Sequence, residues 1–211
     1  MSDIRSFVRR NSRLTDSHRK HIHNNDGILV ETLPENRLKK ASFVGLEIGF
    51  GMGDSLLDVA EKHPDQLWIG IEVYEIGIAS VIRQAKEKKL DNILLLCGDA
   101  VTLLEADFLA NTFDHIRVFF PDPWPKKRHH KRRIMRQEML TMLAPLMKSN
   151  AKLHFATDNL NYAEETLEVL KKLPLFKISD ETLFRPETKF ARKAIAAGST
   201  ITDIVIVKQD S

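Results

Sequence analysis

The sequence contains a single cysteine, Cys97, in 211 residues. One thiol can form neither a disulfide within the chain nor a thiolate zinc cluster, so both are excluded. No run approaches the ~18 apolar residues of a membrane span. The opening stretch, MSDIRSFVRRNSRL, lacks the apolar core of a secretory signal peptide. We therefore expect a cytoplasmic protein with no membrane partner, and nothing in the sequence implies an obligate protein partner.

A strong excess of charge of one sign is also lacking. Lys and Arg number 32 against 29 Asp and Glu, so the formal net charge is only +3. The basic residues are unevenly distributed, however, and crowd into the first forty residues and again into 126–136. Residues 1–42 show no periodicity, and we predict a basic N-terminal arm there, partly disordered without its partner. The remaining residues, 43–211, have a length that suits one domain.

From residue 43 onward, apolar runs alternate with helical patterns. This alternation predicts an α/β fold with a mostly parallel sheet of about seven strands. Strands are expected at 43–48, 66–73, 93–97, 113–120, 151–157, 175–180 and 200–208, and helices at about 54–62, 75–89, 131–148 and 160–172. We expect Asp54 or Ser55 to cap the first of these helices, and a loop at about 181–199. The last two strands are expected to pair as an antiparallel edge.

Carboxylates stand at the ends of four predicted strands. Glu47 and Glu72 close the first and second strands, while Asp99 and Asp122 follow the third and fourth. In a doubly wound sheet, ligands bind outside the carboxyl ends of the strands. We therefore expect these four side chains to line one ligand site.

The glycine loop at 49–53 could serve either a dinucleotide or S-adenosylmethionine. Its spacing is G-x-G-x-G, without the third glycine of the dinucleotide motif G-x-G-x-x-G. Glu47 would repel a pyrophosphate, whereas carboxylates attract the sulfonium and ammonium groups of S-adenosylmethionine. Glu72 is then placed to accept hydrogen bonds from the ribose, and Asp99, in Gly98-Asp99-Ala100, from the adenine amino group. The pattern favours S-adenosylmethionine.

The stretch PDPWPKKRHHKRR at 121–133 is the most specific in the sequence. Of the eight residues 126–133, six are Lys or Arg and the other two are His129 and His130. Phosphates of structured RNA are natural counter-ions for such a segment, and a merely solvated basic face is the alternative. Whether Trp124 stacks on a base or caps the core is left open. No metal is expected, because His18, His21 and His23 lack a fourth ligand and the adjacent His129 and His130 point apart.

The segments EIGFGMGDSL, GIEV, GDA, FPDPWPKKRHHKRR, ATD and RPETKF, in this order, resemble the bacterial tRNA (guanine-N7-)-methyltransferase family over residues 43–192. RSFVRR and RLT near the start are similar to the N-terminal arm of some members. The resemblance implies a Rossmann-like class I methyltransferase fold with an antiparallel edge strand. It also implies methyl transfer from S-adenosylmethionine to N7 of a guanine in the variable loop of tRNA, with S-adenosylhomocysteine as the product.

The resemblance further assigns roles to individual positions. It implies cofactor binding by Glu47, Gly49, Glu72, Asp99, Ala100 and Asp122, of which Asp122 is also the catalytic residue. It implies substrate binding by Lys126, Asp158, Thr188, Lys189 and Phe190. It implies RNA contacts by Arg128, His129, His130, Lys131, Arg132 and Arg133.

The sequence departs from the family pattern at several positions. Ala191 stands where Glu is usual, which removes one guanine contact, and Glu187 is a candidate substitute. Tyr74 stands where His is common, and the ending RKAIAAGSTITD lacks the usual glycine and tryptophan.

Two alternative functions remain. One is a methyltransferase for an exocyclic amine of a base, because Asp-Pro resembles the acidic-Pro motif of such enzymes. The other is a non-catalytic RNA-binding protein on a methyltransferase scaffold, against which the four intact carboxylates argue.

Overall fold

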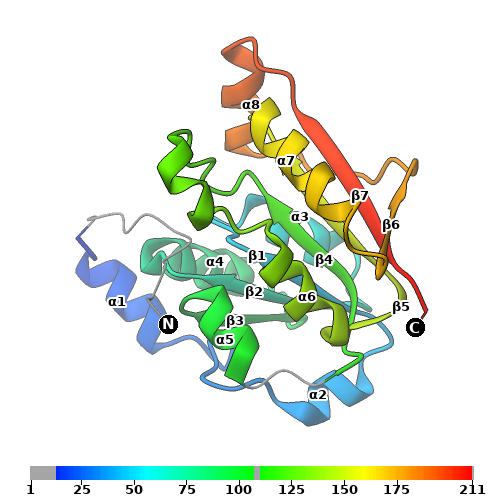
Figure 1. Ribbon diagram of the computed structural model, residues 1–211. Coiled ribbons are helices and arrows are strands. Elements are labelled where there is room, and N and C mark those ends of the chain that lie inside the picture. Colours follow the sequence, from blue (N-terminus) through cyan, green and yellow to red (C-terminus); the bar gives the residue numbers. More distant parts are fainter. Residues whose placement is uncertain (1–12, 107–109, 211) are drawn as a thin grey trace. The chain divides into compact units, whose positions relative to one another are not determined.

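The computed structural model describes residues 13–106 and 110–210 (Figure 1). They belong to two compact units, which we call the N-terminal unit (up to Phe108) and the C-terminal unit (from Leu109). The described residues contain seven strands with mostly parallel pairing and an antiparallel end, as the sequence predicted. No helix in the described ranges is long and apolar enough to cross a membrane.

The N-terminal unit contains three parallel strands in the order β3-β2-β1. They are β1 (Val44–Ile48), β2 (Leu67–Glu72) and β3 (Ile93–Cys97). Every residue of β1 and β2 is buried, which is typical of parallel strands with both faces covered. Helices α3 (Asp54–Lys62) and α4 (Glu75–Lys88) contribute apolar side chains to the core, and α5 (Ala100–Ala106), which was not predicted, follows β3.

The turn between β1 and α3 differs from the expected one. The N-cap of α3 is Gly53, with φ +87° and no side-chain cap, so the prediction of Asp54 or Ser55 was wrong. A Cβ on Gly53 would lie 2.1 Å from Cγ2 of Val81, and a Cβ on Gly77 would lie 1.9 Å from the Gly51 carbonyl oxygen. Glycine is therefore required both by the left-handed backbone and by close packing against α4.

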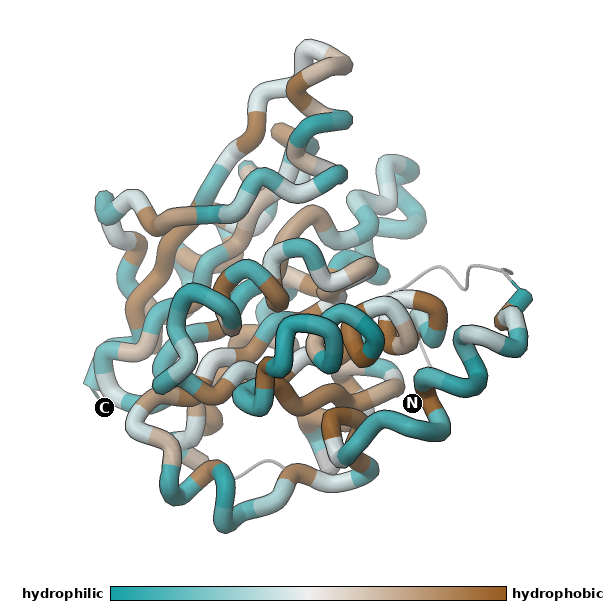
Figure 2. The backbone as a smooth tube through the Cα atoms, turned by 180° about the vertical axis from the view of Figure 1, so that it is seen from behind, coloured by the Kyte–Doolittle hydropathy of each residue, from teal (hydrophilic) through white to brown (hydrophobic). Residues whose placement is uncertain are grey.

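Residues 13–42 contain two helices that the sequence did not predict, α1 (Asp16–His23) and α2 (Glu35–Lys40). Thr15 begins α1, with its hydroxyl accepting a hydrogen bond from the His18 amide at 3.3 Å. The helix is almost entirely hydrophilic and packs against α4 (Figures 1 and 2). Ile28 and Leu38 are buried. The division into an arm at 1–42 and a domain at 43–211 stays a prediction, and RSFVRR lies outside the described residues.

The C-terminal unit contains four strands in the order β4-β5-β7-β6. Strand β4 (Phe113–Phe119) pairs in parallel with β5 (Met147–Thr157). The long strand β7 (Thr202–Lys208) runs antiparallel to both β5 and β6 (Phe176–Ser179), which confirms the predicted antiparallel edge. Helix α7 (Leu160–Leu170) lies along these strands (Figure 1).

Two predictions in this unit were wrong. In place of one helix at 131–148 there are a 3-10 helix η1 (Lys127–Arg132), helix α6 (Gln137–Leu143) and a short 3-10 turn η2 (Ala144–Leu146). Like charges four residues apart, Lys127 with Lys131 and Arg128 with Arg132, disfavour an α-helix here. The expected loop at 181–199 contains helix α8 (Lys189–Ala196), whose N-cap Thr188 accepts a hydrogen bond from the Ala191 amide at 3.2 Å.

Candidate functional site

Glu47 is buried at the carboxyl end of β1, with 2% of its surface exposed. Its Oε2 accepts a hydrogen bond from the Ser55 hydroxyl at 2.9 Å. Ser55 lies in the first turn of α3, where the helix dipole favours negative charge. The fold thus holds a buried carboxylate, which attracts a cationic ligand.

Glu72 at the end of β2 fixes the glycine loop. One carboxylate oxygen accepts a hydrogen bond from the Gly51 amide at 2.7 Å. The other accepts from the amides of Val73 and Tyr74, at 2.8 and 3.0 Å. Part of its acceptor capacity is therefore used by the protein itself. The sequence predicted a ligand contact at Glu72, but not this second, structural role.

Gly49 borders open space at the same strand end. Its φ is +73°, and a Cβ built on it would meet nothing within 4 Å. Its amide donates to the Ile71 carbonyl at 2.8 Å, which ties the loop to β2. A ligand can therefore approach the backbone closely here. The chemistry of the buried carboxylates of Glu47 and Glu72 at this strand end suits a cationic cofactor such as S-adenosylmethionine.

Asp99 caps the start of α5. Its Oδ1 accepts hydrogen bonds from the amides of Val101 and Thr102 at 2.9 and 3.3 Å, and the neighbouring Ala100 is buried. Cys97 is the last residue of β3, close to Asp99 in sequence. The Cys97 thiol is exposed, but partial desolvation by its surroundings, followed by the negative charges of Glu75 and Glu72, raises its pKa. Asp99 thus places a third carboxylate, beside Glu47 and Glu72, at the carboxyl ends of the strands of the N-terminal unit.

In the C-terminal unit, Asp122 follows β4 in a turn with unusual backbone geometry. Phe120 and Trp124, on either side of it, have φ values of +48° and +44°. Such left-handed conformations are uncommon for residues with side chains and cost free energy. Asp122 is half-buried, as are Pro121 and Pro123.

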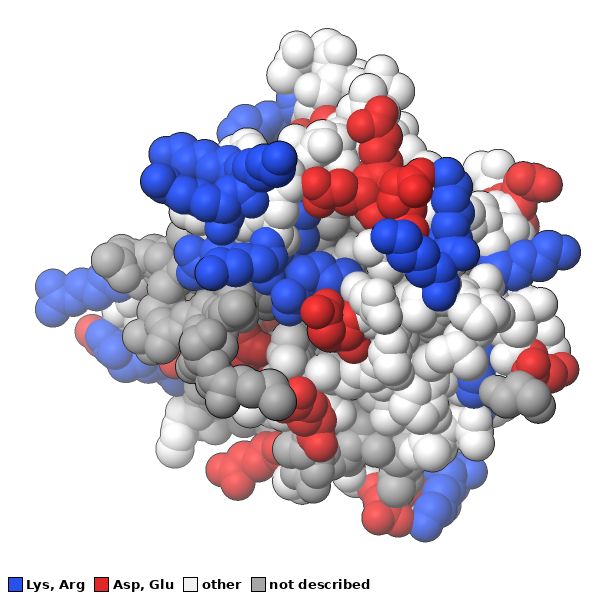
Figure 3. All heavy atoms as spheres, in the orientation of Figure 1, with Lys and Arg blue, Asp and Glu red and all other residues white. Residues whose placement is uncertain are grey.

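The basic segment that follows forms η1. Lys126, Lys127, Arg128 and Lys131 are exposed, and Lys and Arg side chains gather over this segment in Figure 3. Trp124 packs within the segment, with the Arg132 guanidinium 4.1 Å from its ring centroid and the His129 ring edge-on at 5.9 Å. Desolvation, followed by the charges of Arg128 and Arg132, lowers the pKa of His129.

Arg133 differs from the other cations of the segment, because only 2% of its surface is exposed. Its guanidinium binds the Pro123 carbonyl at 2.9 Å and Glu165 of α7 at 2.5 Å. His130 contacts the other carboxylate oxygen of Glu165 through Nδ1 at 2.7 Å. His129 and His130 thus contact different partners, Trp124 and Glu165. The burial of Arg133 argues against its predicted RNA contact.

The remaining predicted substrate residues lie in two places in this unit. Asp158 is exposed after β5, while Thr188 is buried and begins α8 with the exposed Lys189. The side chain of Phe190 lies outside the described part. Ala191 is buried, with 1% exposed, so the usual Glu would have to displace its surroundings.

Sequence reasoning missed an ion-pair network that supports the 185–188 stretch. Arg185 donates to both carboxylate oxygens of Asp203, at 2.9 and 3.2 Å, and the buried His154 lies 2.7 Å from the same carboxylate. Burial would raise the pKa of Asp203, but the bonds from His154 and Arg185 outweigh it and lower that pKa. The network joins β5 and β7 to the loop that leads to Thr188. No spacing rule in the sequence points to it.

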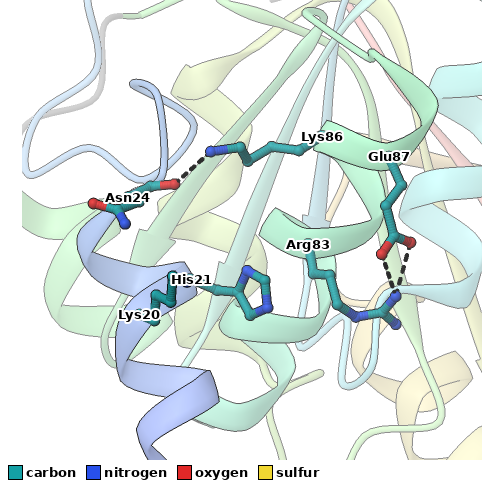
Figure 4. A pocket seen from close by; sticks show the side chains of 6 residues that line it. All are labelled: Lys20, His21, Asn24, Arg83, Lys86 and Glu87. Atoms are coloured by element: carbon teal, nitrogen blue, oxygen red, sulfur yellow. Dashed lines mark hydrogen bonds and ion pairs between the residues drawn. The ribbon is translucent and has the colours of Figure 1, made fainter.

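A pocket of about 240 Å³ lies between α1 and α4 in the N-terminal unit (Figure 4). Its lining is basic, but two of its cations have carboxylate partners: Lys86 pairs with Asp26 at 2.6 Å and Arg83 with Glu87 at 2.7 Å. These cations are already neutralised, and we do not assign the pocket a ligand. Among the described residues, no group of three or more His, Cys, Asp or Glu could hold a metal ion.

Comparison with known proteins relates the chain to methyltransferases. A family model described as "Putative methyltransferase" matches residues 21–204. The tRNA (guanine-N(7)-)-methyltransferase of Actinobacillus pleuropneumoniae serotype 5b is 39% identical, over 98% of this chain and 88% of the relative. The enzyme of the same name from Methylobacillus flagellatus is 36% identical, over 96% of this chain and 90% of the relative.

Solved structures confirm the fold. The 16S rRNA methyltransferase KamB has a TM-score of 0.62 at 15% identity, covering 98% of this chain and 99% of its own. A 16S rRNA (adenine(1408)-N(1))-methyltransferase from Catenulisporales acidiphilia, solved with its cosubstrate, has a TM-score of 0.60 at 16% identity, covering 87% and 95%. This likeness shows the Rossmann-like class I methyltransferase fold.

Proposed function

The chain belongs to the bacterial tRNA (guanine-N7-)-methyltransferase family, and from this premise we propose that it methylates N7 of a guanine in the variable loop of tRNA. The observation that carries the proposal is the 36–39% identity to enzymes of that name over nearly the whole chain. A tRNA substrate also makes the cytoplasm the expected compartment.

The proposed methyl donor is S-adenosylmethionine, which supplies an electrophilic methyl group when bound and leaves as S-adenosylhomocysteine. The buried Glu47 and the open space beside Gly49 support this choice. The residues proposed to hold the donor are Glu47, Gly49, Glu72, Asp99, Ala100 and Asp122. The chemistry requires no metal, and we propose none.

The proposed reaction needs little acid–base chemistry. Guanine N7 has an in-plane lone pair, so it attacks without prior loss of a proton, and the base becomes cationic. The enzyme's task is positioning and electrostatic support. We assign the negative charge beside the base to Asp122 and acceptance of guanine N–H bonds to Asp158. The other proposed substrate contacts are Lys126, Thr188, Lys189 and Phe190.

The exposed cations of η1 and its N-cap are the proposed tRNA contacts. Phosphates supply most of the affinity in such interfaces, and exposed Lys and Arg side chains reach them directly. The proposed set is the exposed Lys126, Lys127, Arg128 and Lys131, together with the partly exposed His129, His130 and Arg132. Arg133 is left out because it is buried.

A direct test is incubation with unmodified tRNA and methyl-labelled donor, followed by identification of the nucleoside by mass spectrometry. The proposal expects 7-methylguanosine at a single position in the variable loop. Label on an exocyclic amine of a base would establish the first alternative. Binding of tRNA without any label transfer would establish a non-catalytic RNA-binding protein.

A further inference from the structure

The turn that bears Asp122 is strained and must be held by contacts around it. Phe120 and Trp124 both adopt left-handed backbone conformations, with φ +48° and +44°. Each such conformation costs free energy and persists only where the surrounding structure fixes it. A group that binds the backbone between these two residues is therefore a candidate for control of the turn.

Arg133 makes such a contact. Its Nε donates to the carbonyl of Pro123 at 2.9 Å, one residue after Asp122. Its Nη1 binds Glu165 at 2.5 Å, and its guanidinium carbon lies 4.7 Å from the Tyr162 ring centroid. The planar guanidinium has several donors in fixed directions, so it can hold a carbonyl and a carboxylate together. Arg133 thus links the turn to α7.

Helix α7 provides a firm support for this link. Tyr162 is fully buried, and its hydroxyl accepts a hydrogen bond from the Met135 amide at 2.9 Å, just beyond Arg133. Glu165, one helical turn later, also contacts Nδ1 of His130 at 2.7 Å through its second oxygen. One carboxylate therefore receives contacts from two residues at the end of the basic segment.

We propose that Arg133 and Glu165 are a pair of positioning residues, which hold the Asp122 turn in its strained form for methyl transfer without contacting RNA. The inference rests on the proposed function. Loss of either partner lets the backbone at Phe120 and Trp124 relax and displaces Asp122. Displacements of about 1 Å can cost about 100-fold in rate. Affinity for tRNA, which depends on the exposed cations, stays the same.

The kinetic test compares Arg133→Met and Glu165→Gln with Glu168→Gln, a matched change at an exposed position of the same helix. We expect kcat to fall about 100-fold in Arg133→Met and less in Glu165→Gln, whose amide oxygen still accepts one bond. Glu168→Gln keeps the wild-type kcat. The double variant is no slower than Arg133→Met, because both changes break the same interaction. The dissociation constant for tRNA is unchanged in Arg133→Met and Glu168→Gln, and the salt dependence of tRNA binding is unchanged in all variants.

A second readout follows the turn itself. Trp68 and Trp124 are the only tryptophans, so a Trp68→Phe background leaves Trp124 as the sole reporter. We expect acrylamide to quench the fluorescence of Trp124 more strongly in Arg133→Met and Glu165→Gln than in the background protein. Quenching in Glu168→Gln should equal that of the background protein. If Arg133→Met does not fold by circular dichroism, Glu165→Gln carries both tests.

Two results would overturn the inference. A raised dissociation constant and a shallower salt dependence in Arg133→Met, at unchanged kcat, would make Arg133 an RNA contact. Wild-type kcat and wild-type quenching in the variants would show that the pair does not control the turn. If the wild-type protein transferred no methyl group, the proposed function would fail, while the quenching result would still decide whether the pair holds the turn.

Discussion

At the scale of single residues, Glu72 combines a structural role with a proposed role in cofactor binding. Its carboxylate holds the amides of Gly51, Val73 and Tyr74, and it is also proposed to hold the cofactor. Glu72→Ala should weaken S-adenosylmethionine binding by about 1.5–3 kcal/mol, the cost of losing charge-assisted hydrogen bonds. Isothermal titration calorimetry measures this, with the exposed Glu75→Gln as the control. Tight binding of NAD without binding of S-adenosylmethionine would reverse the cofactor assignment.

His115 links stability to pH. Burial, followed by the charges of Arg117 and His154, lowers the pKa of His115 well below 6.5. The folded protein keeps this imidazole neutral, whereas the unfolded chain protonates it near pH 6.5. The contribution of neutral His115 to the free energy of unfolding is complete above pH 6.5. It falls, by up to about 1.4 kcal/mol per pH unit, as the pH drops from 6.5 towards the pKa of the folded state. Asp203, with its lowered pKa, loses its contribution only at more acidic pH.

Urea unfolding at a series of pH values between 7.5 and 5 tests this linkage. The free energy of unfolding should fall with pH in the wild-type protein. His115→Gln should lower it at pH 7.5 but make its decline below pH 6.5 shallower. An equally steep decline in both proteins would assign the pH dependence to other groups.

At the scale of elements, η1 should act as an electrostatic binding surface. Neutralising its exposed Lys127, Arg128 and Lys131 should weaken tRNA binding strongly. The slope of log K against log salt should become shallower by about 0.7–0.9 for each phosphate that the variant no longer neutralises. Neutralising Lys171 and Lys172, exposed at the end of α7, is the matched control and should leave the slope unchanged. A slope that does not respond to the η1 changes would mean that the segment is only a solvated face.

Elements were predictable where their pattern depends on burial alone. Strands β1 to β5 appear as apolar runs, because both faces of a parallel strand are covered. The prediction of a single helix at 131–148 was wrong. Repulsion between like charges disfavours an α-helix in the basic segment, and the hydrophobic period on which the prediction relied does not detect that repulsion. Helix α8 was missed because its eight residues are too few to show a clear helical period, although Thr188 is a favourable N-cap. Local pattern thus predicts the sheet better than the elements around the site.

At the scale of the whole molecule, the sequence predicted where carboxylates stand in the fold better than which groups they contact. The carboxylates at the strand ends follow directly from the alternation of strands and helices. The partners do not, because Gly51 binds Glu72 across 21 residues and Arg133 binds Glu165 across 32. Such pairs have no periodic signal, so Arg133 could only be grouped with its charged neighbours. Its burial separates it from them.

The identity of the methylated atom separates the two enzyme hypotheses, methylation of guanine N7 and methylation of an exocyclic amine. If Asp122 supports a ring nitrogen that becomes cationic, Asp122→Asn keeps the shape of the turn but loses the charge. It should then lower kcat more than it weakens tRNA binding, in steady-state assays paired with filter binding. Asp114→Asn, on strand β4 and paired with Lys148 at 2.7 Å, is a control in which kcat should stay near the wild-type value.

A substrate change tests the same point from the side of the RNA. In 7-deazaguanine a carbon replaces N7, which removes the lone pair and leaves the exocyclic amine and the shape of the base intact. A tRNA carrying this base at the target position should bind the enzyme but accept no methyl group. Transfer to it would show that the reacting atom is not N7, and a role for Asp122 as a base at the exocyclic amine would then replace the electrostatic one.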